Sequence, residues 1–146
     1  MFEQILIPTD GSDAARDAVK TGIDVAAEHE GTVHLLSVVK PVRSGDEGVS
    51  TDELQEVMQG ARERQVAELA ELAEANGVVA ITDVREGVPF REIIDYAETN
   101  DIDLIVMGTH GRTGLGRYLL GSVTEKVVRL SEIPVLTIHT RPTEVE

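Results

Sequence analysis

Two kinds of hydrophobic pattern alternate along the 146-residue chain. Short apolar runs typical of strands recur at residues 2–7, 32–39, 78–84, 102–107 and 133–139. Between them, apolar residues at steps of three and four predict helices over residues 12–31, 50–77, 89–100 and 120–130. The polar segment 40–49 fits neither pattern and is expected to be the longest loop. Strands that alternate with helices in this way indicate βαβ units and a parallel sheet.

The ends of two predicted helices carry recognisable signals. Ser12 is a suitable N-cap for the first helix, and Gly31 suits its C-terminal stop. Ser50 and Glu53 have the spacing of a capping box at the start of the second helix. These signals bracket the helices independently of the hydrophobic period.

The order of the elements predicts an α/β fold, a doubly wound five-stranded parallel sheet with four helices in a Rossmann-like sandwich. Pro134 cannot donate a ladder hydrogen bond, so we expect the last strand to lie at an edge of the sheet. The length favours one domain, taken as residues 1–140, with a frayed C-terminal tail over residues 141–146.

The composition excludes several functional classes. The formal charge of −14 argues against nucleic acid as a partner, because phosphate binding rests on clustered Lys and Arg. With no cysteine, there is no disulfide framework and no thiol nucleophile. We see no targeting or membrane-spanning stretch, so the expected location is cytoplasmic and no membrane partner is expected. Excess acid with only three lysines resembles the composition of proteins from salt-loving, halophilic organisms.

The segment after the fourth strand is the strongest candidate for chemistry. Residues 108–117 contain four glycines, which allow backbone N–H groups to turn around an anion, and a helix N-terminus follows. Residues 104–124 contain no Asp or Glu, whereas His110, Arg112 and Arg117 are present. Ligands of open parallel sheets bind beyond the carboxyl ends of the strands, where this segment begins. The pattern favours an anion site, although a Gly-rich turn without a ligand is also consistent with it.

Familiar phosphate-binding motifs are absent from the segment. There is no G-x-x-x-x-G-K-[ST], and Gly114-Leu115-Gly116 lacks the third glycine of G-x-G-x-x-G. We therefore set aside a typical P-loop enzyme and a typical dinucleotide dehydrogenase.

A different spacing is present, Gly108-x2-Gly111-x9-Gly121-Ser122, and it resembles the universal stress protein family in its ATP-binding branch. Further matches cover nearly the whole chain, at residues 5–12, 35–39, 107–111, 120–125 and 133–136. The combined matches lie on the expected elements, which makes the resemblance more specific than one G-x-x-G.

The resemblance implies an ATP site with a nucleotide-bound Mg²⁺ or Mn²⁺ ion. Pro8 and Val38 would lie beside the adenine, and Asp10 near the ribose or the metal ion, which it would hold indirectly. The implied ATP-binding residues are Pro8, Thr9, Asp10, Val38, Met107, Gly108, Thr109, His110, Gly111, Arg112, Gly121, Ser122, Val123 and Thr124. Simpler roles stay open for three of them: a turn or helix cap for Asp10, a loop histidine held by backbone contacts for His110, and a solvated surface cation for Arg112.

The resemblance predicts an ATP-binding stress-response or signalling module with slow or no hydrolysis. The first alternative is a nucleotide-independent dimeric stress or interaction protein of the same fold. The second is an ATP-hydrolysing or nucleotidyl-transferring enzyme, which would need a positioned base or a basic phosphate clamp that we do not identify. We expect a homodimer through the last strand, where Val135, Leu136 and Ile138 form a short apolar edge.

Overall fold

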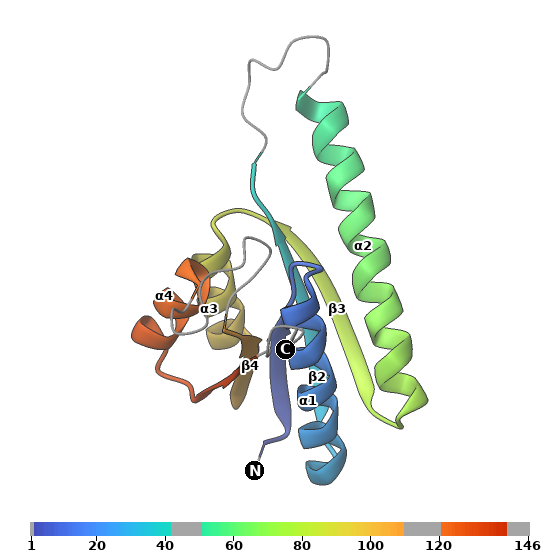
Figure 1. The fold of residues 1–146 in the computed structure, drawn as a ribbon, viewed down its shortest axis with the longest axis vertical. Coiled ribbons are helices and arrows are strands. Elements are labelled where there is room, and N and C mark those ends of the chain that lie inside the picture. The colour runs from blue at the N-terminus through green and yellow to red at the C-terminus, as the bar shows by residue number, and fades with distance from the viewer. Residues whose placement is uncertain (1, 42–50, 110–120, 140–146) are drawn as a thin grey trace, which may run out of the picture.

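The computed structural model describes residues 2–41, 51–109 and 121–139, which form five strands and four helices in alternation (Figure 1). The elements are β1 (Gln4–Pro8), α1 (Asp13–His29), β2 (Thr32–Val39), α2 (Thr51–Ala75), β3 (Val79–Glu86), α3 (Pro89–Thr99), β4 (Leu104–Gly108), α4 (Ser122–Leu130) and β5 (Val135–Ile138). The predicted α/β class is confirmed. The Ser50 capping box, the glycines between residues 110 and 120, and the tail after residue 139 lie outside the described residues.

The sheet is parallel throughout, in the order β3-β2-β1-β4-β5. The edge position predicted for the last strand is confirmed, and β3 forms the other edge. The chain crosses to the opposite side of β1 after β3, so the topological switch point lies between β1 and β4. β3 continues to Glu86, beyond the predicted end at Val84, because it pairs with β2 up to Val39↔Glu86. Strand pairing therefore extends past the apolar run.

Helices cover both faces of the sheet, as Figure 1 shows, with α1 and α2 on one side and α3 and α4 on the other. Alternate residues of β1 enter the two cores: Ile5 and Ile7 pack with α1 and α2, and Leu6 with α3 and α4. All three side chains are fully buried. No helix within the described ranges is long and apolar enough to span a membrane.

The ends of α1 show one confirmed signal and one corrected signal. Ser12 is the N-cap, and its side chain accepts a hydrogen bond from Ala15 N. At the other end, Glu30 rather than Gly31 takes the left-handed conformation, with φ 53°. A Cβ at Gly31 would lie 2.9 Å from the carbonyl oxygens of Phe2 and Glu3. Gly31 is thus required by a close backbone approach and not by the helix stop that the sequence predicted.

A buried histidine joins β2 to the elements on either side. His34 is 4% exposed, and its ring forms hydrogen bonds of 2.7 Å with the Tyr96 hydroxyl through Nδ1 and with Gln4 Oε1 through Nε2. Both bonds suit a neutral ring that accepts from the tyrosine O–H and donates to the amide oxygen. Burial lowers the pKa of His34 below its ordinary value of 6.5.

We expect this histidine to destabilise the fold in mild acid. Because the unfolded chain takes up the proton at a higher pH than the folded chain, the free energy of unfolding falls as the pH falls below about 6.5 and levels off below the folded pKa. Thermal unfolding between about pH 8 and about pH 5 measures the decline. His34→Gln is expected to make this decline in stability smaller. His29→Gln changes a partly exposed histidine and serves as the control, which is expected to show the same decline as wild type. Identical declines in wild type and His34→Gln would contradict the prediction.

Candidate functional site

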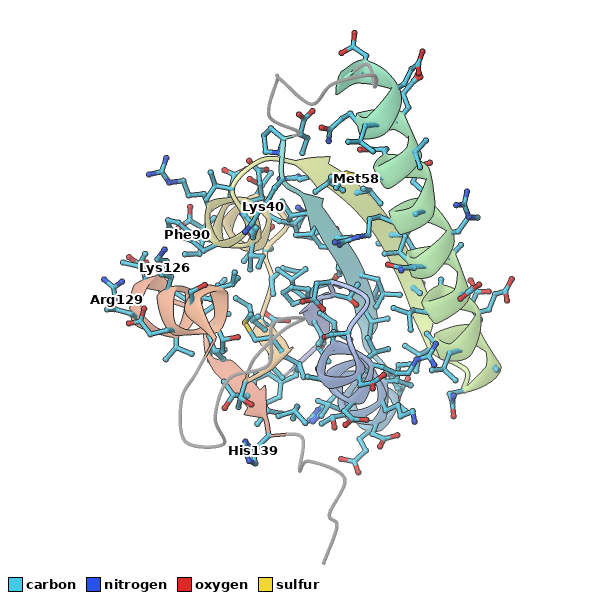
Figure 2. All side chains as sticks on the ribbon, turned by 45° about the horizontal axis from the view of Figure 1, so that its top comes forward. Lys40, Met58, Phe90, Lys126, Arg129 and His139 are labelled. Atoms are coloured by element: carbon cyan, nitrogen blue, oxygen red, sulfur yellow. The ribbon has the colours of Figure 1, made fainter. Side chains whose placement is uncertain are left out.

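A cavity of about 370 Å³ lies at the carboxyl end of the sheet, where β1, β2 and β4 end. It includes the switch point between β1 and β4, the position at which open parallel sheets bind their ligands. Figure 2 shows that Lys40, directly after β2, and Met58, on α2, lie at this same end of the sheet. The cavity is lined by Pro8, Thr9, Asp10, Ser12, Ala15, Leu36, Val38, Lys40, Met58, Arg62, Pro89, Ile93, Met107, Gly108, Gly121, Ser122, Val123 and Thr124.

This cavity brings together most of the residues that the sequence proposed. Among the described candidates, Thr109 is the exception and does not line it. His110, Gly111 and Arg112 lie outside the described residues. The predicted candidates that line the cavity are Pro8, Thr9, Asp10, Val38, Met107, Gly108, Gly121, Ser122, Val123 and Thr124.

The turn between β1 and α1 forms one wall and is ordered by its own side chains. Gly11 N donates to Thr9 Oγ1 at 3.3 Å, and Ser12 N donates to Asp10 Oδ1 at 2.9 Å. The turn-capping role that the sequence left open for Asp10 is therefore confirmed, and the same residue lines the cavity. Gly11 has φ +83°, a left-handed conformation that favours glycine. The bond from Ser12 N holds the carboxylate of Asp10 in this turn.

The junction between β4 and α4 forms the opposite wall. Thr124 is buried, and its hydroxyl donates to Gly108 O at 2.8 Å, which ties the first turn of α4 to the end of β4. Gly121 N donates to Thr109 O at 2.6 Å, and Thr109 N donates to Ile138 O. Thr109 thus links β4, α4 and β5 through its backbone. A Cβ at Gly108 would lie 3.1 Å from the Cβ and the carbonyl oxygen of Ala14, so this glycine also permits close packing against α1.

The N-terminus of α4 opens onto the cavity. Gly121 is the N-cap and has no side-chain oxygen to offer the first N–H groups of the helix. Ser122, Val123 and Thr124 of the first turn all line the cavity. The helix macrodipole adds a partial positive charge at this end. This wall is therefore suited to an anion.

The third wall comes from α2 and was missed by the sequence analysis. Met58 and Arg62 line the cavity, and Arg62 Nη1 donates to the hydroxyl of Ser37 at 2.7 Å. Ser37 is fully buried on β2, and Lys40 follows the same strand. The i, i+4 spacing puts Met58 and Arg62 on one helix face. Nothing local in the sequence indicates that this face meets the end of β2.

The charges around the cavity contrast with those of the whole chain. The ionisable residues that line its described walls are Asp10, Lys40 and Arg62, a balance of +1 in a chain of net charge −14. Positive side chains concentrated around a cleft attract anionic ligands despite an acidic exterior. The site therefore favours an anionic ligand that also has apolar parts, because Pro8, Val38 and Met107 face the same space.

The donor set fits a metal ion only if the ligand brings it. Asp10 is the one carboxylate among the described lining residues, and the described part of the chain has no group of three or more His, Cys, Asp or Glu placed to hold a metal. Mg²⁺ commonly binds through one or two carboxylates together with substrate phosphates. A nucleotide-bound ion beside Asp10 is compatible with these residues, whereas a protein-only metal centre is not.

Comparisons with known proteins agree with the fold and with the family that the sequence resembles. The model of the universal stress protein family matches residues 1–139. Universal stress protein MJ0531 of Methanocaldococcus jannaschii is 39% identical over 140 residues, which cover 94% of this chain and 82% of that protein. The matched residues include the β1–α1 turn, α2 and the β4–α4 junction, which form the walls of the cavity.

Solved structures support the same assignment. The structure of MJ0577, also from Methanocaldococcus jannaschii, superposes with a TM-score of 0.88 at 32% identity and covers 98% of this chain and 99% of that one. A universal stress protein in complex with cAMP superposes with a TM-score of 0.75 at 25% identity, covering 95% and 98% of the two chains. With the family model matching almost from end to end and these structures sharing the sheet and its four helices, the chain belongs to the universal stress protein family.

Proposed function

We propose that this protein binds ATP, together with Mg²⁺ or Mn²⁺, in the cavity at the carboxyl end of the sheet. The observation that carries the proposal is the composition of that cavity: the N-terminus of α4 and two cations surround it, in a chain with twice as many acidic as basic residues. The cAMP complex of a structural neighbour supports an adenine nucleotide as the ligand class. In this arrangement the phosphates lie against Gly108, Gly121 and Ser122, and the adenine lies against Pro8 and Val38.

In this proposal Asp10 faces the metal ion and not the bare phosphates. Its Oδ1 atom accepts from Ser12 N, so the carboxylate is held in a fixed orientation at the cavity wall. A carboxylate beside a triphosphate is repulsive unless a divalent ion lies between them. Removal of the divalent ion is therefore expected to weaken ATP binding.

The proposed role is a stress-response or signalling module of the cytoplasm, in which nucleotide occupancy is the signal. The described lining residues include no histidine, and their one carboxylate is engaged in the turn, so we expect hydrolysis to be slow or absent. Slow turnover would let the bound state persist long enough to be read by other proteins.

Two measurements test the proposal. Nucleotide extracted from the purified protein is identified by mass, and ATP with Mg²⁺ is then titrated calorimetrically into the nucleotide-free protein. We expect saturable binding of one ATP per chain, weaker when Mg²⁺ is chelated. Absence of binding by nucleotide-free protein would contradict the proposal and favour the nucleotide-independent interaction protein.

We further propose that two copies associate through the β5 edge. β5 ends the sheet, and Val128, Leu130 and Leu136 of α4 and β5 are exposed apolar side chains. An edge strand with apolar neighbours is prone to pairing with another chain. Light scattering is expected to give twice the chain mass of 15.8 kDa.

The opposite edge of the sheet supplies a matched control for the dimer. Leu136→Glu on β5 is expected to produce monomers, because it places a charge in the proposed contact. Ile81→Glu makes the same kind of change on β3, where Ile81 is 46% exposed compared with 38% for Leu136, and is expected to leave the dimer intact. Monomeric wild type, or dissociation by Ile81→Glu alone, would contradict association through β5.

A further inference from the structure

The α2 wall places a fixed guanidinium at the cavity. Arg62 Nη1 donates to Ser37 Oγ at 2.7 Å, and Ser37 is fully buried on β2. A guanidinium has five N–H donors in a rigid fork, so one bond to a buried hydroxyl orients the others. Arg62 also lines the cavity, so the anchored guanidinium lies at the ligand space. The side chain is therefore held in place before any ligand arrives.

Arg62 and the α4 wall lie on different sides of the cavity, because they are attached to different strands of the sheet. Its anchor lies on β2, and β1 lies between β2 and β4 in the strand order. Neighbouring strands are about 4.8 Å apart, so the Arg62 anchor and the end of β4 are separated by about 10 Å across the sheet. A ligand whose phosphates lie on α4 must extend that far for its remaining part to meet Arg62.

We propose that Arg62, positioned by Ser37, contacts the nucleoside half of the bound nucleotide and not its phosphates. This inference rests on the proposed function and adds the residue that recognises the base and ribose. A guanidinium is only a donor, and the acceptors of a nucleoside are ring nitrogens and hydroxyl oxygens. Met58, four residues earlier on the same helix face, adds an apolar, polarisable surface for the base. The α2 wall thus carries selectivity for the nucleoside.

The test compares ligands that share one nucleoside and differ in phosphate number. AMP, ADP and ATP are titrated into wild type and Arg62→Met, with Arg64→Met as the control, because Arg64 is an exposed arginine on the same helix. Arg62→Met is expected to lower the affinities for AMP, ADP and ATP by the same factor, about tenfold. Arg64→Met is expected to leave all three affinities unchanged.

Ser37 provides a second and independent readout. Ser37→Ala removes the anchor and keeps the cation, so we expect a loss of about threefold that is again equal for AMP, ADP and ATP. In the Arg62→Met background, Ser37→Ala is expected to change no affinity, because the anchored group is gone. Arg62→Met alone removes the donor to the buried Ser37 hydroxyl, whereas the double variant removes the hydroxyl as well. Comparing the two variants therefore separates an effect on ligand binding from a loss of stability.

Three outcomes would overturn the inference. Wild-type affinities in Arg62→Met would exclude a ligand contact. A loss that grows from AMP to ATP would place Arg62 on the phosphates. Additive losses from Ser37→Ala and Arg62→Met would show that Ser37 does not act through Arg62. In each case wild type still binds ATP and the proposed function stands, whereas no binding by wild type would remove the proposed function and this inference together.

Discussion

Gly121→Val is expected to lower the affinity for ATP by at least about 100-fold while the ligand-free protein keeps its fold. Gly121 lines the cavity at the N-terminus of α4, and a branched side chain there occupies the space proposed for the phosphates. The backbone tolerates the change, because φ −63° and ψ 156° are accessible to any residue. Its two hydrogen bonds, from Gly121 N to Thr109 O and from Glu125 N to Gly121 O, are made by the main chain and persist.

Calorimetric titration and thermal unfolding of the same variant separate binding from stability. Valine is a poor N-cap compared with glycine, so a loss of about 1 kcal/mol in the free energy of unfolding is expected. Gly60→Val serves as the control, because Gly60 lies on α2 and is not among the residues that line the cavity. Wild-type ATP affinity in Gly121→Val would contradict the placement of the phosphates on α4.

Gly22→Val is expected to destabilise the fold by about 3 kcal/mol. A Cβ at Gly22, on α1, would overlap with Ile7 Cδ1 and lie 3.0 Å from Ile7 Cγ1 and 3.8 Å from Val106 Cβ. Ile7 and Val106 are fully buried, so neither side chain has open space to move into. Either Ile7 must leave its rotamer inside the packed core or the helix must move away from the sheet, and both disturb the core that α1 forms with β1 and β4.

Gly60→Val is the matched control for this change as well. Both glycines lie inside helices, but among the described residues a Cβ at Gly60 would meet only Arg64 Nη1, at 3.6 Å. Valine has a higher helix propensity than glycine, so this variant is expected to be neutral or stabilised by about 0.5 kcal/mol. Denaturant unfolding measures both free energies. Equal stabilities of the two variants would show that α1 packs less closely on the sheet than the structure indicates.

The hydrophobic pattern predicted every helix and strand that the structure describes, because the period of burial is a local property of the sequence. Element ends were predicted less well. The strand predicted to end at Ile7 includes Pro8, which pairs with Leu36. The fourth helix begins at Ser122 and leaves Gly121 as its N-cap. Such ends depend on which backbone groups find a partner, and that is decided between elements.

The cavity was predicted in part, and the missing part has one cause. The glycines and the acid-free window mark the β4 end and the start of α4 along the sequence, whereas the residues at the β1 and β2 ends were identified through the resemblance to the universal stress protein family. Arg62 and Met58 carry no such mark, since an arginine and a methionine on an amphipathic helix occur in many proteins. Their position depends on where α2 lies against β2.

The sequence by itself therefore determined the alternation of strands and helices, the edge position of β5 and the Ser12 N-cap of α1, because period, proline geometry and side-chain capping act over a few residues. Only the tertiary structure decided that α2 meets the end of β2 at Ser37, that Gly31 lies against Phe2 and Glu3, and that Gly22 lies against Ile7. These contacts join segments between 15 and 29 residues apart in the chain. They are fixed by how helices pack on the sheet, which no local pattern encodes.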